Sequence, residues 1–104
     1  MEQSTLLLKR IAEHLKSKHQ LHSLRGEVIK TKRKVGTEYV HFIPVLFIPE
    51  QKIPIEITAD KQRDEDYMKI GMLPMVISES LTVTAEVYID EFLEFHKKWK
   101  RGHI

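Results

Sequence analysis

The sequence contains no cysteine, no glycine cluster and no long hydrophobic run. Without cysteine, the chain can form neither a disulfide framework nor a thiolate-ligated zinc or iron–sulfur site. Its four glycines, at positions 26, 36, 71 and 102, are isolated from one another, which excludes a glycine-rich phosphate-binding loop. The leucine run at residues 6–8 is too short for a signal-peptide core or a membrane span. We therefore expect a cytoplasmic protein without membrane contact.

The chain is long enough for one domain, and its charges are unevenly distributed along the sequence. A chain of 104 residues can bury its own core, so we expect residues 1–104 to form a single domain. The net charge is only +2, but residues 1–35 hold nine Lys and Arg against three Glu, whereas residues 36–96 hold four against twelve acids. Charges interact over about 8 Å at physiological salt, so a local basic patch can still attract an acidic partner.

Two terminal segments have the pattern of amphipathic helices. Within residues 4–19, apolar side chains recur at helical spacing, at Leu8, Ile11, Ala12 and Leu15, and Ser4 or Thr5 is placed to cap the first turn. Residues 90–101 begin with a possible cap, Asp90, and carry acids early and bases late, as the helix dipole favours. Phe92, Phe95 and Trp99 share one face with His96, so we expect this helix to bury its aromatic side chains against a sheet.

The middle of the chain has the pattern of β-strands. The strands are predicted at residues 27–34, 38–48, 53–58, 75–77 and 81–89. Gly36 provides the turn of a hairpin, and Pro44 predicts a bulge or an edge position because it has no N–H for a ladder. Residues 59–70 fit either a short helix or an acidic loop. The sequence thus predicts an α+β fold with an N-terminal amphipathic helix, an antiparallel β-meander of three to five strands, and a C-terminal amphipathic helix packed on the sheet.

Histidine is frequent enough to raise the question of a metal site. His14, His19 and His22 are separated by five and three positions, not by the four that bring two ligands to one helix face. No carboxylate close in the sequence completes a set of ligands. We therefore expect no bound metal and no cofactor.

One catalytic alternative comes from the predicted order of elements. The order of a helix, three strands, a helix and a strand is similar to the core of the PD-(D/E)xK nucleases, and Glu50 and Lys52 have the E-x-K spacing. Pro49 places this pair in a turn and not within a strand, and Glu56 in the third strand is expected to face water. A metal-dependent nuclease is accordingly the lowest alternative, and we expect no catalytic site and no enzyme.

A basic strand supports a second alternative, nucleic-acid binding. Lys30, Lys32 and Lys34 repeat at every second position, so on a strand they share a face about 6.6 Å apart. The strand itself lacks aromatic side chains for base stacking, and lysines on edge strands also prevent aggregation. The predicted contacts are Arg25, Lys30, Lys32, Arg33, Lys34, Lys97, Lys98 and Arg101. Binding through them would be weak and largely independent of sequence.

The first prediction for function is a small protein-interaction or accessory module that binds another protein or forms a homodimer. Residues 39–48 are apolar on both faces of the predicted strand, so a second layer or a second subunit is expected to cover them. The acidic segment 60–66, with three consecutive acids at 64–66, is suited to a basic partner. The predicted interface residues are Tyr39, Phe42, Leu46, Ile48, Asp64, Glu65 and Asp66.

Overall fold

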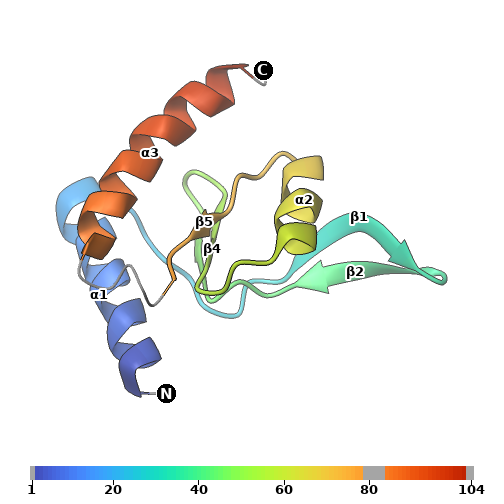
Figure 1. Ribbon diagram of the computed structural model, residues 1–104, viewed down its shortest axis with the longest axis horizontal. Coiled ribbons are helices and arrows are strands. Elements are labelled where there is room, and N and C mark those ends of the chain that lie inside the picture. The colour runs from blue at the N-terminus through green and yellow to red at the C-terminus, as the bar shows by residue number, and fades with distance from the viewer. Residues whose placement is uncertain (1, 79–83, 103–104) are drawn as a thin grey trace.

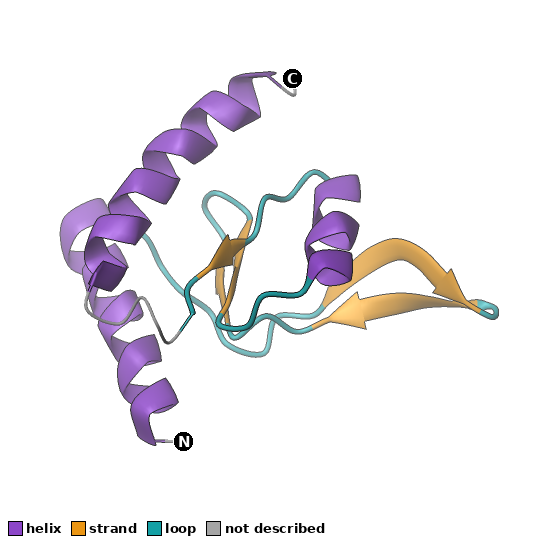
Figure 2. Cartoon of the chain, in the orientation of Figure 1, coloured by secondary structure: helices purple, strands orange, loops and turns teal. Residues whose placement is uncertain are grey.

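The computed structural model describes residues 2–78 and 84–102. In chain order the elements are α1 (Glu2–His19), β1 (Ile29–Val35), β2 (Glu38–Phe42), β3 (Leu46–Ile48), β4 (Ile53–Glu56), α2 (Lys61–Lys69), β5 (Met75–Val76) and α3 (Ala85–Gly102), as Figure 2 shows. The predicted α+β class, with a helix at each end and strands between them, is confirmed. No described helix is both long enough and apolar enough to cross a bilayer.

The elements occupy three regions along the longest dimension of the molecule. Figure 1 shows α1 and α3 side by side at one end, the short strands β4 and β5 in the middle, and the β1–β2 hairpin extending from the opposite end beneath α2. The principal extents are 41 × 35 × 22 Å. The hairpin is therefore the most distant part of the fold from the paired terminal helices.

The strands form two sheets where the sequence predicted one meander. The β1–β2 hairpin is a two-stranded antiparallel sheet, and the other three strands form a sheet in the order β3-β4-β5. The predicted strand at 38–48 is interrupted at Ile43 and Pro44, because proline cannot donate a ladder hydrogen bond and the chain turns there into a different sheet. The short β5 pairs parallel with β4, not antiparallel, since α2 lies between them in the chain as a crossover.

The main core lies between the terminal helices and the three-stranded sheet. Its buried side chains are Leu7, Ile11, Leu15, Leu21, Leu46, Ile48, Ile53, Ile55, Met75, Ile77, Ala85, Ile89 and Leu93. The predicted docking of the C-terminal helix on the sheet is thus confirmed. Hydrophobic side chains at helical spacing in α1 and α3 meet the fully buried β3 and β4, so each helix is held by burial of its apolar face.

A smaller core joins the hairpin to α2. It consists of Ile29, Phe42, Phe47 and Tyr67, and the rings of Phe42 and Tyr67 meet edge to face at 5.2 Å between centroids. Of the two alternatives for residues 59–70, a short helix and an acidic loop, the structure has the helix, which is α2. The side chain of Asp60 accepts a hydrogen bond from the backbone N–H of Arg63, which caps the first turn.

The predicted strand at 81–89 is wrong for its described part. Residues 81–83 lie outside the described residues, and α3 already begins at Ala85. The alternation of apolar and polar residues fits a strand, but Ala85, Ile89 and Leu93 also recur at every fourth position. This second period is that of a helix, and the three residues form its buried stripe. Asp90 is consequently inside α3 and is not its cap.

The predicted burial of the aromatic residues in α3 needs one correction. Phe95 is 51% exposed, because the buried stripe passes through His96 on the next position. His96 is stacked on Phe92 with ring centroids 6.1 Å apart, and burial lowers the pKa of its imidazole. The neutral ring is a packing residue of the terminal helix.

The cover predicted for residues 39–48, by a second layer or by a second subunit, is confirmed within the chain for one half and stays a prediction for the other. Leu46 and Ile48 in β3 are buried. Tyr39 is 38% exposed and Ile43 is 57% exposed, since the hairpin leaves the sheet and only one of its faces meets α2. The exposed half of the segment is therefore open to a partner.

Candidate nucleic-acid interface

One face of the β1–β2 hairpin points away from α2 and carries only basic and aromatic side chains. The strand register pairs Lys30 with His41 and Lys34 with Tyr39, and it shifts between these two lysines. Lys32 lies in this irregular part of β1 and continues the alternation of exposed side chains. All five side chains are exposed. We call these five residues the outer face. It contains no acidic side chain.

Tyr39 organises the lysines around its ring. The ammonium nitrogens of Lys30 and Lys34 lie 4.3 Å and 4.8 Å from the ring centroid, which is within range of a cation–π interaction. The Nδ1 atom of His41 donates a hydrogen bond to the carbonyl of Tyr39 at 3.0 Å. Among the described residues, none of the three lysines forms an ion pair with a carboxylate. Their charge is available to an external anion.

The inner face of β1 holds the hairpin against α2. Ile29 and Thr31 are buried, and the Thr31 hydroxyl donates a hydrogen bond to the carbonyl of Val40 at 2.7 Å. Arg33, also on this face, pairs its Nε with the Oδ2 atom of Asp66 in α2 at 2.8 Å. Arg33 is therefore a structural partner of α2, although the sequence grouped it with the lysines.

Asp66 is the buried end of this contact, being only 1% exposed. Burial opposes ionisation of the carboxyl group, but hydrogen bonds from Arg33 and Gln62 outweigh it and hold the pKa below its ordinary value. A buried carboxylate in this position requires its partners. The ion pair therefore fixes the orientation of the hairpin relative to α2.

A second polar cluster connects α2 to β4. The Nε atom of Arg63 and the hydroxyl of Tyr67 both donate to Oε2 of Glu56, each at 2.7 Å. Arg63 also lies over the ring of Phe42, with its guanidinium carbon 4.3 Å from the centroid. The prediction that Glu56 faces water is wrong, because its carboxylate is buried among these donors. The pKa of Tyr67 is raised by burial and by Glu56, so its hydroxyl keeps the proton that it donates.

The stability of the protein is expected to fall on acidification below about pH 4, in part through Asp66. Its pKa is lower in the folded protein than in the unfolded chain. The carboxylate therefore stabilises the fold above the unfolded pKa, and this contribution is lost as the pH falls through the folded pKa. Urea unfolding of Asp66→Asn between pH 7 and pH 3 should show a smaller loss than the wild type shows. An identical loss in both proteins would contradict the role of Asp66.

No family model, no curated protein and no solved structure matches the chain. The function is therefore inferred from the residues of the fold itself.

The remaining predicted nucleic-acid contacts are dispersed. Arg25 is exposed in the loop before β1. Lys97, Lys98 and Arg101 are exposed on the last turns of α3, which Figure 1 places with the paired helices and away from the hairpin. The C-terminal charges accordingly do not extend the outer face.

The predicted protein-interface residues also separate into two groups. Four of them are buried within the chain: Leu46 and Ile48 in the main core, Phe42 in the smaller core, and Asp66 where α2 meets the hairpin. Tyr39 and Glu65 are exposed, and Asp64 is half-buried. Only the exposed members are accessible to a partner.

The sequence did not predict the aromatic members of the outer face. Base-stacking side chains are absent from β1, but Tyr39 and His41 reach the same surface from β2 through the register of the hairpin. Gly36 was predicted to form the turn, and side chains alternate along each strand. Pairing the two strands outward from this turn would therefore have placed Tyr39 and His41 on the same face as the lysines.

Proposed function

We propose that the protein binds nucleic acid through the outer face of the β1–β2 hairpin and prefers single strands to duplexes. The observation that carries the proposal is the composition of this face, where three lysines lack carboxylate partners and two of them, Lys30 and Lys34, lie over the ring of the exposed Tyr39. Such a combination supplies both parts of single-strand recognition, which are cations for the phosphates and an aromatic ring for the bases.

Each side chain of the outer face has a defined role in the proposed complex. Lys30, Lys32 and Lys34 neutralise phosphates and release the counterions bound to them. Tyr39 stacks on an exposed base, which requires that the base is unpaired and therefore favours single strands. The face offers few groups that read base edges, so we propose binding with little sequence preference.

The salt dependence of binding tests this function. The logarithm of the affinity for a labelled single-stranded oligonucleotide is expected to fall with the logarithm of salt concentration with a slope of about −2, from about −0.7 for each of three lysines. Fluorescence anisotropy over a salt series measures the slope, and a duplex of the same sequence is expected to bind more weakly. The proposal fails if no binding occurs at about 50 mM salt or if the affinity does not change with salt.

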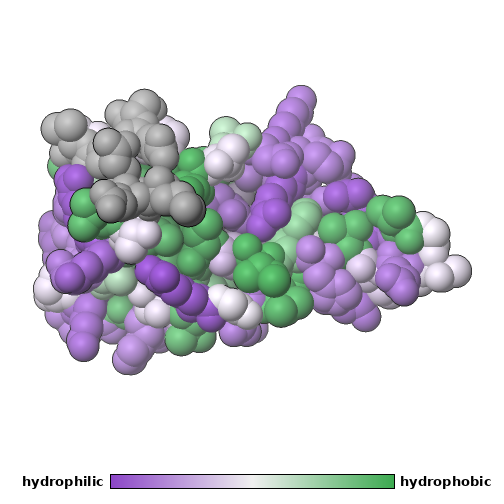
Figure 3. All heavy atoms as spheres, turned by 90° about the horizontal axis from the view of Figure 1, so that it is seen from below, coloured by the Kyte–Doolittle hydropathy of each residue, from purple (hydrophilic) through white to green (hydrophobic). Residues whose placement is uncertain are grey.

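A homodimer acting as a protein-interaction module is the second candidate function. It is favoured by exposed apolar side chains around the hairpin, at Val28, Val35 and Ile43. Figure 3, which views the molecule from below, shows hydrophobic surface between the helical end and the hairpin. A second copy that covered these side chains would double the mass of 12.3 kDa in light scattering. The mass of one chain at high protein concentration would exclude the dimer.

A further inference from the structure

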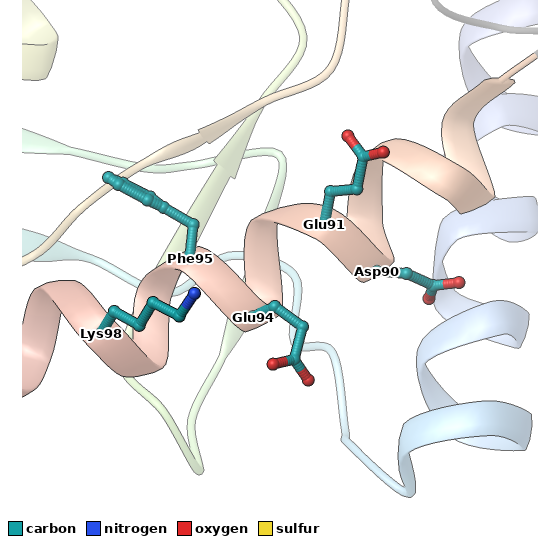
Figure 4. Close-up of a pocket in the computed structure, with 5 residues that line it drawn as sticks. All are labelled: Asp90, Glu91, Glu94, Phe95 and Lys98. Carbon is teal, nitrogen blue, oxygen red and sulfur yellow. The ribbon is translucent and has the colours of Figure 1, made fainter.

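Three potential metal ligands that are far apart in the sequence converge where α1 meets α3. His14 and His19 belong to α1, and Asp90 belongs to α3. The Nε2 atoms of His14 and His19 lie 2.8 Å and 2.7 Å from the same oxygen, Oδ1 of Asp90. Figure 4 shows the Asp90 side chain pointing from α3 toward the neighbouring α1. The cluster lies at the end of the molecule opposite to the hairpin.

The spacing of these atoms suits a small cation. One ligand atom from each residue lies within 4.8 Å of the other two, and all three side chains are partly buried. Around a tetrahedral ion with bonds of about 2.1 Å, pairs of ligands lie about 3.4 Å apart. The three ligand atoms are therefore already near the separation that an ion held between the two imidazoles and the carboxylate requires.

We propose that His14, His19 and Asp90 form a zinc site that joins α1 to α3 and leaves a fourth position for water. Two imidazole nitrogens and one carboxylate oxygen are ligands that Zn²⁺ accepts, and three protein ligands with an open position are a common arrangement for this ion. Magnesium and calcium prefer sets of oxygen ligands, so neither is expected to compete.

A neighbouring lysine orients the proposed carboxylate ligand. The Nζ atom of Lys18 donates to the other oxygen of Asp90, Oδ2, at 2.5 Å. This contact directs Oδ1 toward the two histidines, as a hydrogen-bonded partner commonly does for a metal ligand. When zinc binds, each histidine carries its proton on Nδ1 and coordinates through Nε2.

The sequence prediction of no metal depended on the absence of a nearby carboxylate. Because they are five positions apart, the side chains of His14 and His19 project in different directions from α1. This arrangement is unfavourable for an ion held by α1 alone. Asp90 of the facing helix lies between them and supplies the missing ligand. The site is therefore a product of the tertiary contact.

The test is titration of the purified full chain with zinc chloride, followed by calorimetry and thermal unfolding. We expect one zinc ion for each chain with a Kd of about 1 µM or tighter. A rise in melting temperature of roughly 10 °C is expected at a zinc concentration about 100-fold above the Kd. Magnesium chloride alone is expected to give neither effect.

Variants assign the binding to these three residues. His14→Ala, His19→Ala and Asp90→Asn are each expected to weaken zinc binding by on the order of 100-fold. His22→Ala is the matched control, because the His22 side chain is 76% exposed and contacts Glu50 instead of Asp90. Circular dichroism of each variant without metal checks that it is folded, and Asp90→Asn keeps the shape of the side chain if an alanine variant does not fold.

The proposal is overturned if the wild type binds no zinc at about 1 mM, or if all three ligand variants bind zinc as tightly as the wild type. It is also overturned if His22→Ala causes the same loss as the ligand variants, because the ion would then be bound elsewhere. These outcomes are independent of whether the hairpin binds nucleic acid.

Discussion

Replacing Lys30, Lys32 and Lys34 together by alanine is expected to lower the affinity for a single-stranded oligonucleotide by on the order of 100-fold at low salt. Each lysine that leaves the outer face removes one phosphate contact and the counterion release that accompanies it. The salt dependence of the remaining binding should also become nearly flat. Fluorescence anisotropy with the same labelled oligonucleotide measures both changes.

Arg33 is deliberately retained in this variant. The three lysines are exposed and have no ion pairs among the described residues, so their loss should change stability by no more than about 0.5 kcal/mol each. A matched control replaces Lys97, Lys98 and Lys100 of α3, which changes the net charge equally at the other end of the molecule. An equal loss of affinity in both triple variants would show that the net charge, and not the hairpin, determines binding.

Replacing Arg33 by alanine is expected to lower the free energy of unfolding by about 2 kcal/mol. Asp66 would lose its cationic partner while its carboxylate remains buried beside Gln62. Breaking a fully buried ion pair from one side costs more, but the Arg33 side chain is 37% exposed and the loss is smaller. Thermal unfolding should show a decrease in melting temperature of roughly 10 °C.

Two comparisons separate this effect from a general loss of charge. Lys32→Ala removes a neighbouring cation from the exposed face of the same strand and should leave stability almost unchanged. Adding Asp66→Asn to Arg33→Ala should recover part of the lost stability, because the unpaired charge is then removed. If Lys32→Ala were as destabilising as Arg33→Ala, the Arg33–Asp66 contact would not be the cause.

The features that could be predicted from the sequence are those that local patterns determine. Alternation in residues 30–34 correctly placed the three lysines on one exposed face, because the period of a strand assigns each side chain to a side. The same rule placed Arg33 on the opposite face, but it could not reveal that the buried carboxylate of Asp66 in α2 lies next to Arg33. The positive charge of Arg33 suggested a contact with nucleic acid, whereas its actual contact is with a residue of the same chain.

The features that could not be predicted depend on contacts between distant segments. Pro44 indicated a disturbance in its strand, but the separation of the chain into two sheets depends on how the hairpin meets α2. The alternation in residues 81–89 suggested a strand because a short apolar stretch fits two periods, and from Ala85 onward packing against α1 selects the helix. His14 and His19 had no visible partner because Asp90 follows 71 positions after the second of them.

The outer face illustrates the same limit for the proposed function. Each of its strands alone lacks one part of a single-strand binding surface, since β1 has the lysines and β2 has the aromatic rings. Only the register of the hairpin combines them on one side. The buried contacts of the inner face keep this side oriented away from α2, which links the stability of the hairpin to its proposed use.

The proposed function requires that the outer face of the hairpin contacts nucleic acid directly. Titration of the isotope-labelled protein with a single-stranded oligonucleotide, observed by nuclear magnetic resonance, tests it residue by residue. We expect the largest chemical-shift changes at the five residues of the outer face, with little change along α1 and α3. These residues are Lys30, Lys32, Lys34, Tyr39 and His41. Changes concentrated on the terminal helices, or no changes at low salt, would contradict it.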